Sequence, residues 1–135
     1  MIAPPLNASV MRPLDLSAFE SAVLKWIAAR SGDDALKHQV ANVQVVERDY
    51  TVVGCYTTLM VASDVPPSSG SYANHGPLEG PSFRSDAVEH GGGTLLWFRS
   101  GRADCLEIYA HGDYFPAEHA ELGEFVLYGE SESTA

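Results

Sequence analysis

The sequence has no apolar stretch that approaches the roughly 18 residues needed to span a membrane. Residues 1–13 also lack the pattern of a secretory signal peptide, because they contain three prolines and no basic residue before Arg12. Only two cysteines, Cys55 and Cys105, occur in 135 residues. A chain of this length can build a core without covalent cross-links, so we predict buried thiols in preference to a disulfide. These features predict a cytoplasmic protein with no membrane partner.

Basic residues are scarce, and none follows Arg102. The chain has 8 lysines and arginines against 18 aspartates and glutamates, which gives a formal net charge of −10. Such a charge repels the phosphates of nucleic acids and anionic lipid surfaces, so the sequence excludes both as general partners. The charge attracts a basic protein, and the alternative is a charge that only keeps a solvated face soluble.

Complete catalytic motifs are also missing. His90-Gly91-Gly92-Gly93 is similar to the oxyanion-hole turn of esterases, but no G-x-S-x-G nucleophile motif accompanies it and the chain is short for such a hydrolase. No lysine or helix of a phosphate-binding loop follows the three glycines, so we expect them to separate two strands. Neither cysteine lies in a C-x-x-C motif. We therefore expect no cofactor, and the missing motifs favour a non-enzymatic function.

The patterns that are present predict an α+β fold. Ser17 and Glu20 fit the capping box that starts a helix, which we expect over residues 17–31, and Gly32 is typical of a helix end. An apolar stripe with aromatic members marks the buried face of this helix. A short second helix is expected over residues 33–41.

From residue 42 the apolar period changes to two, which predicts β-strands. The clearest hairpin joins residues 94–99 to residues 103–110. Residues 63–82 are mostly turn-forming and predict a long loop. We predict one domain over residues 1–135, with the helices packed on a mainly antiparallel sheet of about five strands. The other strand segments are residues 43–45, 50–62, 83–89 and 124–128, and the ends expected to be frayed are residues 1–13 and 129–135.

Glu107 lies in the middle of a predicted strand, on the same face as Cys105 and Tyr109. If that face is covered, burial raises the carboxyl pKa, and Glu107 becomes a candidate acid, base or ligand anchor with residues 63–82 as a lid. If the face is open, Glu107 is a solvated residue with no special chemistry. The sequence leaves both interpretations open.

The strand end beyond Glu107 carries possible metal ligands. His111 and Asp113 are close enough to share an ion, and Glu118 or His119 could supply a third ligand. The spacing loosely resembles the H-x-H…E pattern of cupins, but Asp113 replaces the second histidine and the second cupin motif is missing. Glu107 itself is about 13 Å from His111 along a straight strand, which is too far to share one ion. We therefore predict polar residues at a strand end and no metal site.

Two segments resemble those of a group of small uncharacterised bacterial proteins. Thr51-Val52-Val53-Gly54-Cys55-Tyr56-Thr57 is similar to T-G-V-G-F-[FY]-T, with departures at the second and fifth positions. Residues 90–116 are similar to H-G-x-G, a strand, a turn glycine, L-E-x-Y-x-[YH]-G-D and a proline. The resemblance covers about half the chain, implies a shared α+β fold and carries no reaction with it. It points to Glu107, Tyr109 and His90, and the complete set of ligand or partner candidates is Glu107, Tyr109, His90, Tyr56, His111 and Asp113.

Three functions remain open from the sequence. The first is a protein-interaction module whose acidic surface binds a basic protein, since the chain resembles small acidic immunity-type or accessory proteins in size and charge. The second is a small-ligand or enzymatic site on the sheet face around Glu107 and Tyr109. The third is a structural homo-oligomer that forms through the sheet. The missing catalytic motifs favour the first.

Overall fold

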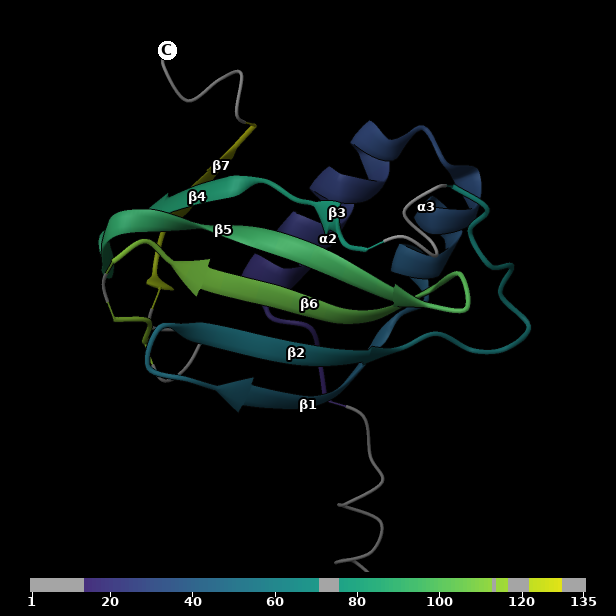
Figure 1. Cartoon of the computed structure of the whole chain (residues 1–135), viewed down its shortest axis with the longest axis horizontal. Helices are drawn as coiled ribbons and strands as arrows, with labels where there is room; N and C mark the ends of the chain where they lie inside the picture. The colour runs from purple at the N-terminus through teal and green to yellow at the C-terminus, as the bar shows by residue number, and fades with distance from the viewer. Residues whose placement is uncertain (1–13, 71–75, 113, 117–121, 130–135) are drawn as a thin grey trace, which may run out of the picture.

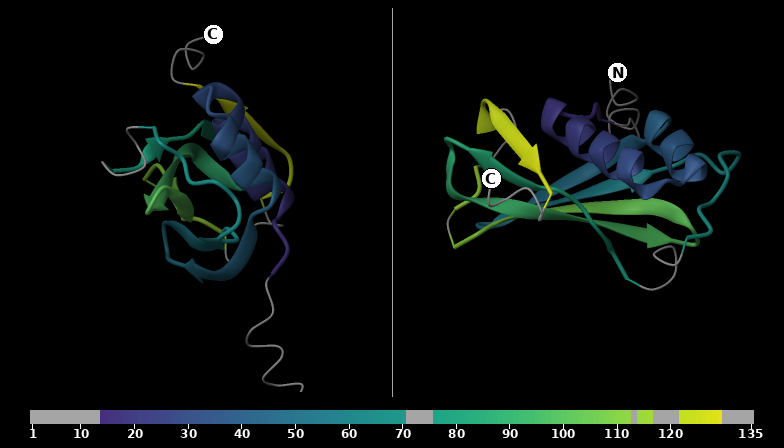
Figure 2. Two further views of the ribbon diagram at one scale, coloured as in Figure 1. Left: turned by 90° about the vertical axis from the view of Figure 1, so that its right-hand side faces the viewer. Right: turned by 90° about the horizontal axis from the view of Figure 1, so that it is seen from above.

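The computed structural model describes residues 14–70, 76–112, 114–116 and 122–129. Two helices pack on one face of a seven-stranded sheet in which all neighbouring strands are antiparallel. Figure 1 looks onto the other face of the sheet, with the helices behind it, and Figure 2 shows the two layers from the side and from above. The predicted α+β fold is confirmed, with seven strands instead of about five. Within the described ranges, no helix is both long and apolar enough to cross a membrane.

The first helix, α2 (Ala18–Ser31), begins and ends where the sequence predicts. The Ser17 hydroxyl accepts a hydrogen bond from Glu20 N at 3.0 Å, and Glu20 Oε1 accepts one from Ser17 N at 2.8 Å, which completes the capping box. Gly32 ends the helix with a φ of 69°, a conformation that glycine adopts without strain. The predicted second helix is α3 (Asp34–Ala41).

The strands run in the order β1-β2-β6-β5-β4-β7, and β3 pairs with a further part of β5. Two hairpins, β1–β2 and β5–β6, meet where β2 pairs with β6. At the β4–β7 end the sheet curls toward the helices, so that β7 lies beside α2 (Figure 2). The strands are β1 (Gln44–Tyr50), β2 (Gly54–Met60), β3 (Leu78–Glu79), β4 (Ser82–Ser85), β5 (Val88–Arg99), β6 (Arg102–Ala110) and β7 (Phe125–Tyr128).

The hydrophobic core fills the space between the helices and the sheet. Phe19 of α2 contacts Phe83 of β4 and Phe125 of β7 edge to face, with 5.0 Å between ring centroids in each case. Leu106 and Ile108 of β6 face the same space and are fully buried. Burial of each such side chain contributes about 1.5–3 kcal/mol, so this core holds the helical layer on the sheet.

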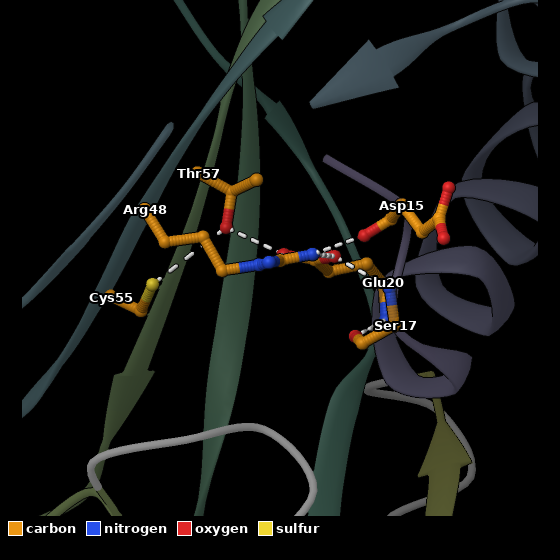
Figure 3. Close-up of polar contacts among 6 residues, drawn as sticks. All are labelled: Asp15, Ser17, Glu20, Arg48, Cys55 and Thr57. Carbon is orange, nitrogen blue, oxygen red and sulfur yellow. Dashed lines mark hydrogen bonds and ion pairs between the residues drawn. The ribbon is translucent and has the colours of Figure 1, made fainter. Parts of the chain in front are cut away.

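A buried ion pair lies at the start of α2 (Figure 3). Glu20 is 0% exposed and accepts hydrogen bonds from Arg48 Nε at 2.8 Å and from Arg48 Nη2 at 2.6 Å. The Thr57 hydroxyl donates a third bond to Glu20 at 2.8 Å, and Arg48 Nη2 also donates to the Asp15 carbonyl at 2.6 Å. Hydrogen bonding to Glu20 raises the pKa of Arg48 above its usual value, so the guanidinium stays charged. The carboxylate is thus both charge-paired and hydrogen-bonded within the core.

The predicted single strand over residues 50–62 is wrong, because a turn divides this segment. β1 ends at Tyr50 and β2 begins at Gly54, and Thr51 N donates to the Gly54 carbonyl at 2.8 Å across the turn. A Cβ at Gly54 would overlap the carbonyl of Ile108, so the backbones of β2 and β6 approach closely here. The β-branched residues of the turn have the composition of a strand, and this hides the turn from sequence patterns.

The predicted strand break at residues 91–93 is also wrong, because all three glycines lie inside β5. The turn comes earlier, and the predicted strand over residues 83–89 is divided between β4 and β5. Close packing explains glycine here: a Cβ on Gly92 would overlap the Tyr109 carbonyl and lie 2.6 Å from Phe83 Cζ. The glycines therefore mark close approach between strands and side chains, not a chain break.

The first part of the predicted loop over residues 63–82 is fixed at one end of the sheet (Figure 1). Gln39 of α3 donates from Nε2 to the Pro66 carbonyl at 3.1 Å, and Ser68 N donates to the Gly101 carbonyl in the β5–β6 turn at 2.7 Å. These contacts join the loop to α3 and to the β5–β6 turn. Residues 71–75 of this loop lie outside the described ranges. So do residues 1–13 and 130–135 of the ends predicted to be frayed.

Candidate functional site

The candidate site is the face of the sheet that points away from the helices, which we call the outer face. On β6, Leu106 and Ile108 are buried against the helices, whereas Cys105, Glu107 and Tyr109 point the other way and are half-buried. Residues opposite one another on paired strands share a face, so the register assigns the remaining members. The central part of the outer face includes Glu47, Asp49, Tyr56, Thr58, Met60, Glu79, Leu95, Trp97, Cys105, Glu107 and Tyr109, and we call these the outer-face residues.

Acidic and apolar side chains alternate in a row across the outer face. Asp49 lies opposite Tyr56, which lies opposite Glu107 on the next strand. Glu107 in turn lies opposite Leu95, which lies opposite Glu79. Adjacent strands are about 4.8 Å apart, so successive carboxylates in this acidic row are about 10 Å apart. No lysine or arginine lies opposite a member of the acidic row in this register, and the row therefore gives the central part of the outer face a negative potential.

Large side chains are exposed beside the carboxylates. Trp97 is 39% exposed, Tyr56 is 43% exposed and Met60 is 47% exposed. Trp97 Nε1 donates to Glu107 Oε1 at 3.0 Å, and this hydrogen bond joins the exposed indole to the centre of the acidic row. Aromatic residues and methionine are enriched in the centres of protein-binding surfaces, where charged groups form the rim.

The structure brings three of the predicted site residues together on this face. Tyr56 and Glu107 are direct cross-strand neighbours, and Tyr109 lies on the same face of β6. His111 follows β6, and its ring contacts the Tyr109 ring with 5.6 Å between centroids. Glu107 is half-buried and not covered, so the interpretation of an open sheet face fits better than that of a buried carboxyl.

His90 lies apart from the outer face. Its Nε2 is 3.9 Å from Oε2 of the neighbouring Glu89. It lines a hollow of about 580 Å³ beside β4 and β7, together with Arg84 and Glu124. The resemblance to the small bacterial proteins points to His90, Glu107 and Tyr109 together. In the structure, His90 and Tyr109 line different cavities.

Within the described ranges, no group of three histidine, cysteine or acidic side chains could hold a metal ion. Of the residues considered as ligands, only His111 lies in those ranges. Asp113, Glu118 and His119 lie outside them, so the absence of a metal site stays a prediction.

Several residues of the site were not among the sequence candidates, and three of them show why. Trp97 alternates with the buried Leu96 on a strand of the predicted hairpin, so the hairpin register could have placed it on the outer face. Glu79 lies in a turn-rich segment that conceals the two-residue strand β3. Trp26 belongs to the apolar stripe of α2, yet it is only half-buried.

A cavity of about 310 Å³ lies at the Glu79 end of the acidic row. Tyr109 reaches it because its ring lies over Gly93, where a Cβ would be 2.6 Å from the ring Cζ. Burial raises the pKa of Tyr109 above its usual value, and the charges of Glu79 and Glu107 raise it further, so the phenol is neutral. The cavity is lined by Trp26 of α2, Glu79, Gly80 and Ser82 of the β3–β4 segment, and Tyr109 and His111.

Both cysteines are unpaired, which confirms the prediction against a disulfide. Cys55 points into the core and Cys105 points to the outer face, so the two thiols lie on opposite sides of the sheet. Burial raises the pKa of Cys55, and burial together with the charges of Asp104 and Glu107 raises the pKa of Cys105 to about 11. Both thiols are therefore protonated at neutral pH.

We expect Cys105 to react with iodoacetamide at pH 8 at least tenfold more slowly in the folded protein than in denaturant, because the thiolate is the reacting form. The raised pKa of Cys105 also makes the free energy of unfolding depend on pH. The contribution of the protonated thiol is fully present below the pKa of an unfolded cysteine, which is about 8.5. This contribution is lost as the pH rises through about 11, so the free energy of unfolding should fall over that range. Mass spectrometry of alkylated peptides measures the rate, and equal rates in both states would contradict the assignment.

No protein family, curated protein or solved structure showed a significant match to this chain.

Proposed function

We propose that the protein is a protein-interaction module, of the immunity or accessory type, that binds a basic protein through the outer face. The acidic row supports this proposal, because its carboxylates alternate with aromatic and apolar groups and no lysine or arginine lies opposite them in the register. A basic partner would place its cations against the carboxylates and bury the exposed Trp97, Tyr56 and Met60.

The same face is poorly suited to binding a second copy of the chain. A twofold interface brings a surface patch against itself, so the acidic row of one copy would meet the acidic row of the other. Like charges held together in this way oppose association. A homo-oligomer through the outer face is thus less well supported than a basic partner.

We also propose a cytoplasmic location, which the two unpaired thiols favour because reducing compartments preserve free cysteines. The negative charge argues against nucleic acid or an anionic membrane as the ligand of this face. An enzymatic role for Glu107 has less support, since its carboxylate is hydrogen-bonded to an exposed indole on an open face.

The proposal is tested by capture of a basic protein at low salt, followed by binding measurements with the purified partner. We expect Trp97→Ala to weaken binding about 30-fold, which corresponds to about 2 kcal/mol. Tyr114→Ala is the matched control, because Tyr114 is 73% exposed but is not an outer-face residue. Equal losses in the two variants would argue against the outer face.

The electrostatic part of the proposal has its own matched pair of variants. The triple variant Glu47→Gln, Asp49→Asn, Glu79→Gln removes three outer-face charges, and we expect a lower association rate and a weaker dependence on salt. A second triple variant removes the same charge from exposed positions elsewhere and should change both quantities much less. If both variants slow association equally, net charge and not the acidic row attracts the partner. The control substitutions are Asp34→Asn, Asp64→Asn and Asp86→Asn.

A further inference from the structure

The cavity at the Glu79 end of the acidic row has an unusual set of polar groups. Within the described part of the chain, no hydrogen bond is formed by the Trp26 indole N–H, the Tyr109 hydroxyl or the side chains of Ser82 and His111. The Glu79 carboxylate likewise has no ion-pair partner in those ranges. By contrast, the Trp97 indole N–H and the Glu107 carboxylate, which lie on the outer face, are hydrogen-bonded to each other. Convergent polar groups without protein partners in one concave site are typical of a ligand-binding pocket.

The charge of the cavity indicates whether a cation or an anion would bind there. Glu79 is the only carboxylate among the lining residues, and no lysine or arginine lines the cavity. The charges of Glu79 and Glu107 both oppose ionisation of Tyr109, which indicates a negative potential at its hydroxyl. An anionic ligand is therefore disfavoured and a cation is favoured.

The shape of the lining groups narrows the class of cation. The Tyr109 ring rests on Gly93 and is in edge-to-face contact with the His111 ring, and both rings line the cavity. Trp26 already carries the guanidinium of Arg30 over one face, 3.8 Å from the ring centroid. A planar guanidinium can stack on an aromatic ring and donate two parallel hydrogen bonds to a carboxylate at the same time. A compact ammonium ion cannot do both.

We propose that this cavity binds an alkylguanidinium group between Tyr109 and Glu79. Its volume of about 310 Å³ corresponds to about ten water molecules, which suits one such group with its alkyl chain. The group could belong to an arginine side chain of a bound protein or to a free small guanidino compound. The inference does not depend on the outer face binding a partner.

The test uses N-acetyl-L-argininamide as the probe and the two tryptophans as internal reporters. In ¹H–¹⁵N spectra, we expect saturable shifts of the Trp26 indole N–H with a Kd of about 1 mM, a value suited to a probe of this size. The Trp97 indole N–H is bonded to Glu107 outside the cavity and should move little. Trp97→Phe assigns the two signals.

Matched probes and variants separate a guanidinium site from general charge attraction. N-acetyl-L-citrullinamide has nearly the same shape without the charge and should bind at least tenfold more weakly. Glu79→Gln should weaken argininamide binding at least fivefold, whereas Glu47→Gln, which removes a carboxylate at β1, should change it less than twofold. Equal binding of the two probes, equal shifts of the two indoles, or no saturable shift would each overturn the proposal.

The source of the guanidinium is decided by competition with the basic partner. If argininamide displaces that partner, the cavity receives an arginine side chain of the partner. If argininamide binds without displacing the partner, or binds when no partner exists, the ligand is a free guanidino compound. The second result would leave the cavity site intact while the proposed function stands or fails by its own test.

Discussion

Arg48→Ala is expected to lower the free energy of unfolding by about 3–5 kcal/mol, which is a large part of the stability of a small domain. The substitution leaves Glu20 in the core, 0% exposed, without the cation that binds both of its oxygens. Thr57 and the Ser17 amide would still donate to the carboxylate, but neither supplies a charge. Urea unfolding followed by circular dichroism measures the change.

Two further variants show whether the loss comes from the unpaired charge. Arg99→Ala removes an arginine whose side chain is 80% exposed, and it should cost less than about 0.5 kcal/mol. The double variant Glu20→Gln, Arg48→Met removes both charges and keeps an oxygen acceptor for the capping box, while the amide nitrogen can donate to the Thr57 hydroxyl oxygen. We expect it to be more stable than Arg48→Ala. A double variant that is as unstable as the single one would show that packing of Arg48, and not burial of charge, controls stability.

Gly92→Ala is expected to destabilise the protein by about 3 kcal/mol through overpacking. The added methyl group would overlap the Tyr109 carbonyl and lie 2.6 Å from Cζ of the fully buried Phe83. Relief requires movement of the β6 backbone, because a carbonyl cannot rotate away as a flexible side chain can. Thermal and urea unfolding of the variant measure the effect.

Gly112→Ala is the control for the intrinsic cost of replacing glycine. A Cβ at Gly112 would meet nothing within 4 Å, but its φ of 64° is unfavourable for alanine. We therefore expect a loss of about 1 kcal/mol from backbone conformation alone. Similar losses at the two positions would show that the contacts of Gly92 relax without cost.

The helices could be predicted because their signals are local. Ser17 and Glu20 mark the start of α2 within four consecutive positions, and Gly32 marks its end. The β5–β6 hairpin is local in the same sense, since its turn joins adjacent strands. That hairpin also places Glu107 and Tyr109 on one face, away from Leu106, as the sequence predicts.

The errors occur where contacts between distant residues decide the conformation. Gly92 has the composition signal of a turn, but the reason for glycine is Phe83 and the β6 backbone. Glu20 carries the signal of a helix cap, and nothing in its neighbourhood in sequence indicates that Arg48 reaches it from β1. Trp26 and Tyr109 line one cavity only after the sheet has formed. Such contacts have no fixed spacing along the chain, so periodicity could not reveal them.

The junction of the two hairpins has a consequence for the order of folding. Tyr56 belongs to the β1–β2 hairpin and Glu107 to the β5–β6 hairpin, and the two become neighbours only when β2 docks on β6. Pairing of strands so far apart in sequence is a slow step, because a long stretch of chain must first be closed. A partly folded chain in which both hairpins have formed but are not yet paired would thus lack the complete acidic row. A partner that binds the acidic row and is present at 100 times its Kd would stabilise the native state by about 2.7 kcal/mol. It would do so by favouring the state in which β2 is paired with β6.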